Sequence, residues 1–195
     1  MPDNERLVWA LEALLDDHTV ILPHYPMAKL PKVLRDSDFT VKVIGEKVED
    51  RFTIYDIRPV SDTTPLCAVG IDIGTTTVYA VLFDLTDGKL LAKASGGNGQ
   101  IRYGADVINR IIEQGKPGGK KKLQKAIVKE TLIPLIAALC KEANITPDQI
   151  LRAAIAANTT MNHLLVGVDA ESVRTEPYIP AFFSWNGLKA SDLKL

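Results

Sequence analysis

Six residues, Asp72-Ile73-Gly74-Thr75-Thr76-Thr77, join two segments of strand-forming composition, residues 66–73 and 75–84. A glycine at the tip of such a turn lets a ligand approach the backbone. Successive N–H groups of a turn can form a concavity that takes phosphate oxygens, and the hydroxyls of the three threonines add donors. Asp72 supplies a hard carboxylate oxygen for a water-bound Mg²⁺. One short turn therefore offers metal ligation and phosphate binding together.

The same six residues also fit an ordinary glycine-containing hairpin with β-branched flanks, and by themselves they do not decide between the two interpretations. Two familiar phosphate-binding motifs are excluded. The chain contains no Gly-Lys-Ser/Thr and therefore no P-loop. A second strand, and not a helix, follows Gly74, so the turn is not a dinucleotide-binding fingerprint of the Rossmann type.

The segments around this turn predict an α/β fold. A third strand at 89–95, after the Asp87-Gly88 turn, would complete an antiparallel three-stranded meander over residues 66–95. Further elements follow from the apolar patterns: a helix over 103–114 with Val107, Ile108, Ile111 and Ile112 on one face, a helix over 123–143 bent at Pro134, a strand over 151–157 and a helix over 159–166. Because parallel strands need a crossover helix, we expect 151–157 to extend the sheet in parallel with 66–73.

Two further polar segments lie where the predicted strands end. Asn158 and Thr159 follow the strand over 151–157 and open the next helix. Ligands of α/β sheets bind at the carboxyl ends of strands, and helix N-termini attract anions, although these two residues could simply cap the helix. Residues 98–107 form a glycine-containing connection that either lines a cleft or only joins a strand to a helix.

The first 62 residues predict a small α/β module of their own. An apolar stripe with helical spacing covers residues 5–15, and a short helix is expected over 30–35 after Pro23 and Pro26 break the pattern. Two strands, at 40–44 and 51–57, are expected around a Gly45-Glu46 turn. Residues 63–65 form a linker, and the net charge changes there from −4 before Pro65 to +3 from it onward.

Composition narrows the class of protein. With 195 residues, 46% hydrophobic and 24% charged, the chain can bury a core. A net charge of −1 supplies no basic field for a nucleic acid. Two distant cysteines, Cys67 and Cys140, cannot build a zinc or iron–sulfur ligand set. The acidic N-terminus and the absence of a membrane-length apolar run predict a cytoplasmic protein with no membrane contact.

Taken in order, three motifs resemble a known family: Asp-Ile-Gly-Thr-Thr-Thr from Asp72, Gln-Ile-Arg-Tyr-Gly-Ala-Asp-Val-Ile from Gln100, and Asn-Thr-Thr-Met from Asn158. The first is similar to the phosphate loop of the actin-like ATPases (the ASKHA superfamily), whose ribonuclease H-like domain begins with a three-stranded meander. All three together resemble the reductive activators of corrinoid proteins. The resemblance covers essentially the whole chain, with residues 1–62 similar to the middle domain of that family and 66–195 to the start of its ASKHA ATPase domain.

The resemblance implies a function and roles for residues. ATP binding and hydrolysis would support the reduction of an inactive Co(II) corrinoid protein to Co(I), with the electron donor unidentified. Asp72 would be the catalytic residue and would bind Mg²⁺ through water. Gly74, Thr75, Thr76 and Thr77 would hold the ATP phosphates, and Asn158 and Thr159 would line the floor of the cleft. The family's iron–sulfur cluster belongs to a domain that this chain lacks.

Departures from the family pattern leave alternatives. Gly99 stands where the family has proline, and Ala157 where it has glycine. The second half of the ASKHA domain is missing, so we expect a fragment that is inactive as an ATPase by itself. The rival interpretations are half of an acyl or sugar kinase domain of the same superfamily, or a non-catalytic module in which residues 1–62 dock to a partner or form a homodimer.

Overall fold

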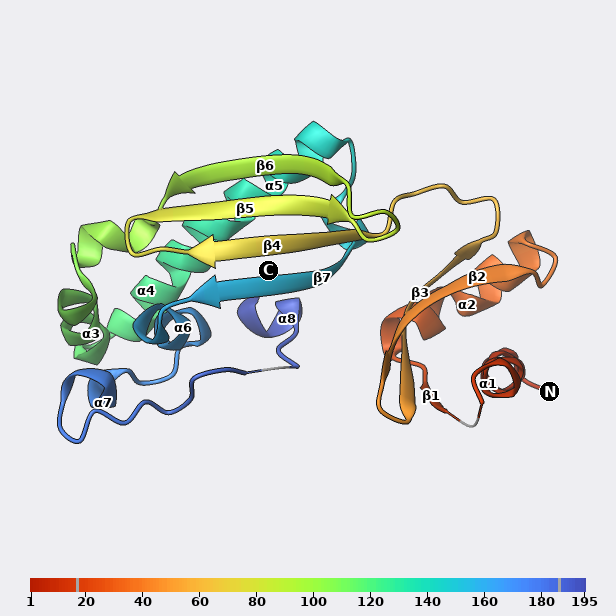
Figure 1. The fold of residues 1–195 in the computed structure, drawn as a ribbon, viewed down its shortest axis with the longest axis horizontal. Helices are drawn as coiled ribbons and strands as arrows, with labels where there is room; N and C mark the ends of the chain where they lie inside the picture. Colours follow the sequence, from red (N-terminus) through yellow and green to blue (C-terminus); the bar gives the residue numbers. More distant parts are fainter. Residues whose placement is uncertain (17, 186) are drawn as a thin grey trace. The chain divides into compact units, whose positions relative to one another are not determined.

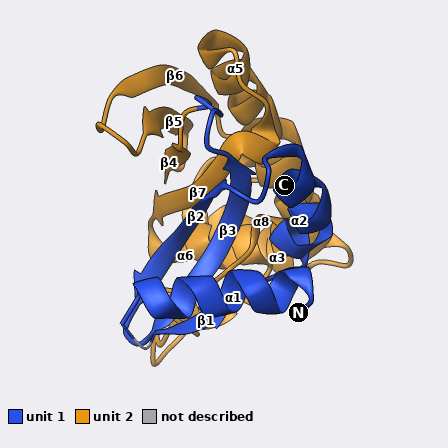
Figure 2. Cartoon of the chain, turned by 90° about the vertical axis from the view of Figure 1, so that its right-hand side faces the viewer, with its two compact units in different colours: residues 1–64 blue, residues 65–195 orange. Residues whose placement is uncertain are grey.

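A computed structural model describes residues 1–16, 18–185 and 187–195, which fall into two units, residues 1–64 and 65–195 (Figure 2). Each unit has a sheet and a hydrophobic core of its own. None of the helices among the described residues combines the length and the apolar composition needed to cross a bilayer. The domain identities expected from the sequence stay predictions.

Unit 1 is a three-stranded sheet packed against two helices. Its elements are α1 (Asp3–Leu14), β1 (Thr19–Ile21), α2 (His24–Asp36), β2 (Val41–Val48) and β3 (Arg51–Pro59). The strand order is β1-β3-β2, with β1 parallel and β2 antiparallel to β3. Helix α2 packs on β3, and α1 packs on α2 and β1. The core residues are Leu7, Val20, Leu30, Leu34, Ile54 and Ile57.

Two expectations for unit 1 are wrong. Helix α2 begins at His24, not near residue 30, because Pro23 is its N-cap and Pro26 lies in the first turn, where no N–H has an intrahelical partner to lose. The Gly45-Glu46 pair is not a turn: β2 runs through it to Val48 with a bulge after Ile44. Gly45 is needed there because a Cβ would lie 2.5 Å from the carbonyl oxygen of Thr53.

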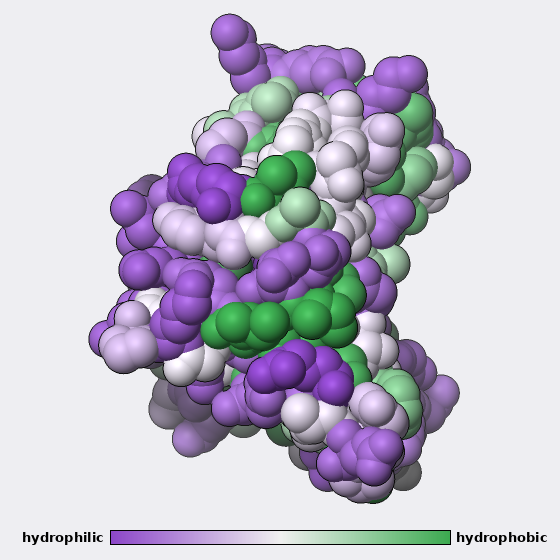
Figure 3. Space-filling view, turned by 90° about the vertical axis from the view of Figure 1, so that its left-hand side faces the viewer, coloured by the Kyte–Doolittle hydropathy of each residue, from purple (hydrophilic) through white to green (hydrophobic). Residues whose placement is uncertain are grey.

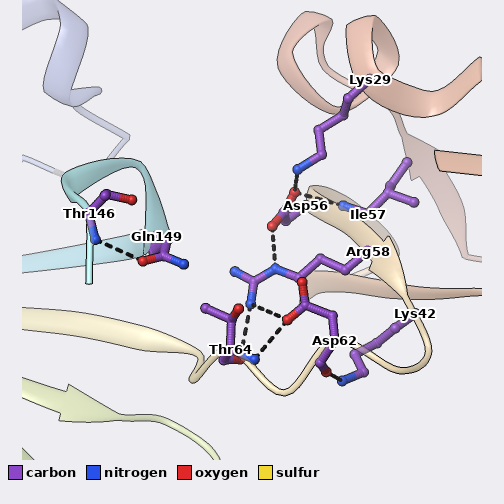
Figure 4. A network of polar contacts seen from close by, with 9 residues as sticks. All are labelled: Lys29, Lys42, Asp56, Ile57, Arg58, Asp62, Thr64, Thr146 and Gln149. Atoms are coloured by element: carbon purple, nitrogen blue, oxygen red, sulfur yellow. Dashed lines mark hydrogen bonds and ion pairs between the residues drawn. The ribbon is translucent and has the colours of Figure 1, made fainter. Parts of the chain in front are cut away.

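A chain of charged side chains ties the end of unit 1 to its sheet (Figure 4). Arg58 Nε donates to Asp56 Oδ2 at 2.6 Å, both residues are buried, and Lys29 also pairs with Asp56. The same guanidinium donates through Nη1 to the carbonyl of Thr64 at 3.1 Å. Thr64 N–H in turn donates to Asp62 Oδ1 at 2.7 Å. Residues 62–64 overlap the expected linker at residues 63–65, and through Asp62 and Thr64 they are bound to Arg58 of β3.

Unit 2 contains the predicted meander and its parallel extension (Figure 1). Strands β4 (Cys67–Ile73), β5 (Thr77–Asp84) and β6 (Leu90–Gly97) pair antiparallel in sequence, and β7 (Ile150–Ala157) pairs in parallel with β4. The strand order is β6-β5-β4-β7. The expected pairing of these four strands is confirmed. The β-branched runs and the Asp87-Gly88 turn direct the antiparallel pairs locally, and the helical crossover allows β7 to lie parallel to β4.

The remaining elements of unit 2 are η1 (Gly99–Tyr103), α3 (Val107–Gly115), α4 (Gly119–Ile127), η2 (Val128–Leu132), α5 (Ile133–Ala143), η3 (Pro147–Gln149), α6 (Thr159–Val166), α7 (Glu171–Arg174) and α8 (Ala190–Leu193). The crossover is continuous from α4 through η2 to α5 and begins at Gly119, one turn earlier than expected. Segment η2 is π-helical and directly precedes Ile133-Pro134, the start of α5. A proline lacks the N–H and crowds the carbonyl four residues earlier, so a wider turn accommodates it.

One face of the four-stranded sheet is covered and the other is open. Alternate residues of β4, among them Val69, Ile71 and Ile73, are buried in a core that includes Leu123 and Leu132 of the crossover. On the opposite face, Asp72 and Tyr79 are exposed, and they border a shallow hollow over the small residues of this face. The hollow is lined on this face by Gly70, Asp72, Tyr79, Val81, Ala154 and Ala156.

The expected helix over 103–114 is partly wrong. Tyr103 ends η1, and α3 starts only at Val107. Of the four apolar residues placed on one face, Ile111 is buried, whereas Ile108 and Ile112 are 47% and 43% exposed. The buried face is instead made with Arg110 and Gln114. Figure 3, which views the chain from the side on which α3 lies in Figure 1, shows a strip of apolar surface bordered by polar side chains.

Candidate functional site

The turn between β4 and β5 is shaped by a close approach of its own backbone. Gly74 N–H donates to the carbonyl of Thr77 at 3.0 Å, which closes the hairpin. A Cβ on Gly74 would lie 2.5 Å from that same oxygen. The glycine is therefore required by the hairpin itself, in addition to any ligand that the turn receives.

The carbonyl oxygens of Gly74, Thr75 and Thr76 are all held by the protein. Asn98 Nδ2 donates to Gly74 O at 2.9 Å, and Asn98 N–H donates to Thr76 O at 2.7 Å. Arg110 Nη2 donates to Thr75 O at 2.6 Å. Asn98 is 2% exposed and Arg110 is fully buried, so both contacts are sheltered from water. The turn is thus tied down through its acceptors.

The donors of the same turn remain available. Among the described residues, neither Thr75 nor Thr76 donates its backbone N–H to another group of the chain. Thr76 is exposed, whereas Thr75 and Thr77 are half-buried. A backbone with its carbonyls bound and its N–H groups free has the composition of an anion-binding nest. The geometry is therefore compatible with phosphate oxygens at this turn.

The second polar segment lies beside the first. The parallel register pairs Ile73 of β4 with Ala157 of β7, so both strands end at the same edge. Asn158 is the N-cap of α6: its side chain accepts from Met161 N–H at 2.9 Å, and its Nδ2 lies 3.5 Å from Thr75 Oγ1. Thr159 is the first residue of α6. The interpretation of Asn158 as a helix cap is therefore confirmed, and its place beside the turn keeps its role in lining the cleft as a prediction.

Asp72 lies on the open face of the sheet, two residues before Gly74. It is paired in register with Tyr79 of β5 and with Ala156 of β7. Its side chain is exposed and contacts the hollow on that face. Among the described residues, no three histidine, cysteine, aspartate or glutamate side chains gather into a metal site. A single carboxylate suits Mg²⁺, which keeps most of its water when it binds beside phosphates.

The third segment, residues 98–107, supplies the support that the sequence interpretation did not identify. Asn98 follows the last strand of the meander, and Asp106 caps α3, accepting from Asn109 N–H at 2.8 Å. The hydrogen bond from Asn109 lowers the pKa of Asp106, against a smaller opposing effect of burial. Helix α3 then carries Arg110 to the turn. The sequence signal that could have indicated this role of Arg110 is its place next to Ile111, as a charged residue within the apolar pattern of α3.

The contacts of Gly99 explain why this chain has glycine where the family pattern has proline. Its N–H donates to Thr131 Oγ1 at 3.0 Å, and Thr131 donates in turn to Ala126 O at 2.9 Å. Proline has no N–H for the first of these bonds. A Cβ at residue 99 would also lie 2.9 Å from Ala126 O. In this chain the residue after Asn98 is therefore part of the contact with the π-helical segment.

His163 is a packed residue of α6. It is fully buried, its Nδ1 lies 2.7 Å from the carbonyl of Thr159, and its Nε2 accepts from Ala181 N–H at 3.1 Å. Its ring stacks on Phe182 with 4.4 Å between the centroids. Both ring nitrogens are occupied by backbone groups, so the histidine anchors the following segment and is not presented to a ligand.

Comparisons with known proteins agree on one group. A family model described as "RACo middle region" matches residues 67–195. The "Corrinoid activation enzyme RamQ" of Eubacterium limosum is 36% identical over 132 residues, which are 67% of this chain and 22% of that protein. Among solved structures, a "Reductive activator for corrinoid,iron-sulfur protein" superposes with a TM-score of 0.86 and 34% identity, covering 100% of this chain and 31% of that one.

These matches establish the fold, and they cover only part of the length of the relatives. The expected class is confirmed: an α/β protein with an open mixed sheet in unit 2, preceded by a small α/β module. The chain spans about a fifth of the curated relative and about a third of the solved structure. The matched "middle region" lies on unit 2, and the likeness of residues 1–62 to a middle domain stays a prediction.

Proposed function

Because this chain belongs to the RACo middle region family, we propose that it is part of an ATP-dependent reductive activator of corrinoid proteins. The relatives are described as corrinoid activators, which supports the general role. In the proposed reaction a Co(II) corrinoid, held by a partner protein, gains one electron and becomes Co(I). The contribution of this chain is to bind the phosphates of ATP at the turn from Gly74 to Thr77.

The observation that carries the proposal is the arrangement of the turn. Its three carbonyls are engaged by Asn98 and Arg110, while the N–H groups of Thr75 and Thr76 have no partner among the described residues. Without an anion these donors must be satisfied by water, so a phosphate that accepts from them replaces hydration and not an internal bond. The hydroxyls of Thr76 and Thr77 add two further donors.

Asp72 is the residue that would hold Mg²⁺, through water. Its carboxylate is exposed at the end of β4, where it can accept hydrogen bonds from metal-bound water. Mg²⁺ bound there would neutralise charge on the phosphates and orient them. Asn158 and Thr159, at the matching end of β7, would line the cleft beside the phosphates.

The iron–sulfur cluster of the family is a separate matter. The only two cysteines, Cys67 and Cys140, are both buried, one on β4 and one on α5. A cluster needs four ligands, so these residues do not fit one. We derive no electron-transfer step through this chain. We propose that a domain outside it delivers the electron to the corrinoid.

The proposal is tested by titrating the ¹⁵N-labelled chain with Mg²⁺-ATP and following its amide resonances. We expect saturable shifts at Thr75 and Thr76, with affinity that falls when Mg²⁺ is removed by a chelator. No saturable change at either amide would contradict phosphate binding at the turn.

Asp72→Asn tests whether the charge of Asp72 is needed for ATP hydrolysis and corrinoid activation. In the full-length activator we expect ATP hydrolysis and corrinoid activation to fall by orders of magnitude, because the variant keeps the size and removes the charge that the metal needs. Thr76→Ala removes one donor of several and is expected to cost only about 1–2 kcal/mol of binding. Wild-type rates in Asp72→Asn would make Asp72 a residue of the turn alone.

A further inference from the structure

Arg110 is a buried cation to which no carboxylate of the described residues is bonded. Its side chain is fully buried in α3. Its Nε donates to Gly104 O at 2.9 Å, its Nη2 to Thr75 O at 2.6 Å, and its Nη1 lies 3.3 Å from Met161 Sδ. Among the described residues, Arg110 forms no ion pair. All its partners are neutral acceptors.

A buried charge of this kind is costly unless something compensates it. Moving a guanidinium out of water is expensive even when its hydrogen bonds are satisfied, and arginine does not lose its proton to escape that cost. Burial lowers the pKa of Arg110, and Asp106, which only partly opposes this, is exposed and bonded to Asn109. The charge therefore lacks a close counter-ion within this part of the fold.

The charge of Arg110 lies where it can attract an anion bound at the turn. The guanidinium lies directly behind the carbonyl of Thr75, in a cluster with Asn98 and Met161, whose sulfur lies 3.9 Å from Asn98 Nδ2. This cluster joins the turn, the end of the meander and α6. An anion bound to the free N–H groups of the turn would be separated from Arg110 by one peptide unit, in surroundings where charges attract more strongly than in water.

We infer that Arg110 is the positioning residue of the turn: it holds the backbone in its anion-binding shape, and its charge is compensated when a polyphosphate binds. This rests on the proposed function and adds the ligand class, a polyanion whose binding is coupled to a buried cation. Arg110 acts through the Thr75 carbonyl and is not expected to touch the ligand.

The wild-type chain provides the first test. With tripolyphosphate as the probe, the Nε–H resonance of Arg110 should shift together with the amides of Thr75 and Thr76 and saturate at the same concentration. If the two amides respond and Arg110 Nε–H does not, the inference is wrong and the proposed function stands. If none of the three responds, the proposed function fails, and this inference fails with it.

Two substitutions separate charge from geometry. Arg110→Met keeps much of the volume and removes the charge, and we expect tripolyphosphate to bind at least tenfold more weakly. Arg110→Lys keeps the charge without the forked donors, and we expect an intermediate affinity. Equal weakening in both variants would overturn the role of the charge, and wild-type affinity in both would overturn the inference entirely. Arg102→Met is the matched control, because Arg102 is exposed and pairs with Glu130. The affinity of this variant for tripolyphosphate should be unchanged.

Discussion

At the scale of single residues, Gly74 shows how a turn can be constrained by its own backbone. Its φ is not in the left-handed region, so conformational freedom is not the reason for a glycine here. The reason is the 2.5 Å that would separate a Cβ at this residue from the oxygen of Thr77. Any side chain at residue 74 must push the two strands apart or tilt that carbonyl, and either change would move the donors of Thr75 and Thr76.

Gly74→Ala is therefore expected to destabilise unit 2 by about 1–3 kcal/mol, the usual cost of forcing an extra group into a tight contact. The measurement is the free energy of unfolding in urea. Gly97→Ala is the matched control, because a Cβ on this residue at the end of β6 would meet no atom of the described part of the chain within 4 Å. This second variant should be unchanged or more stable by about 0.4–1 kcal/mol. Equal stability of the two variants would contradict the contact as the reason for Gly74.

At the scale of elements, helix α3 matters because it carries Arg110. Its start is fixed by Asp106, which accepts hydrogen bonds from both the backbone and the side chain of Asn109. Its buried face combines Ile111 with two polar residues, and Gln114 Nε2 donates to the carbonyl of Val168 at 2.8 Å. The helix is thus positioned by polar contacts at both ends as well as by its apolar contacts.

The cap of α3 predicts a pH dependence. The pKa of Asp106 is lowered below its ordinary 3.8, mainly by the hydrogen bond from Asn109 N–H. A group with a lowered folded-state pKa stabilises the fold above its unfolded pKa and loses that contribution as the pH falls through the folded value. Unit 2 should therefore lose stability below about pH 4.

Asp106→Asn isolates this effect, because asparagine caps a helix about as well and does not titrate. We expect thermal unfolding at pH 6.5 to be nearly unchanged in the variant and its loss of stability between pH 6.5 and pH 3 to be smaller than in the wild type. Asp84, whose pKa is lowered by its bonds to Thr86, titrates equally in both proteins. Identical pH profiles would show that the cap carries no charge-dependent stability.

At the scale of the whole molecule, the two units are separate in their cores. The core of unit 1 includes Leu30 and Ile54, whereas the core of unit 2 includes Ile73 and Leu132, and each unit has its own sheet. The contacts of the turn with Asn98, Arg110 and Asn158 all lie within residues 65–195. The candidate site does not need residues 1–64 for its geometry.

Residues 65–195 expressed alone should consequently unfold in one cooperative transition and keep the amide resonances of Thr75 and Thr76 found in the whole chain. Differential scanning calorimetry and a ¹⁵N correlation spectrum measure the two properties. A broad transition, or displaced resonances at the turn, would mean that unit 1 contributes to the site. That result would also count against the proposed division into domains.

The sequence by itself determined the meander, the crossover, the parallel strand β7 and the start of α6 at Thr159. The meander and the start of α6 depend on signals that act over a few residues: β-branched runs, the Asp87-Gly88 turn and the cap at Asn158. The parallel placement of β7 follows from the general rule that a crossover helix joins parallel strands. The start of α2 was missed because proline in a first turn has the same sequence signal as a helix break.

Only the tertiary structure decided which face of α3 is buried and what supports the turn. Ile108 and Ile112 share a face with Ile111 by spacing, yet the helix is rotated so that Arg110 enters the interior. The contacts of Asn98 with Gly74 and of Arg110 with Thr75 join residues 24 and 35 positions apart. Such pairings depend on how helix and sheet pack, because a local pattern records the composition of each element and not the partner that it meets.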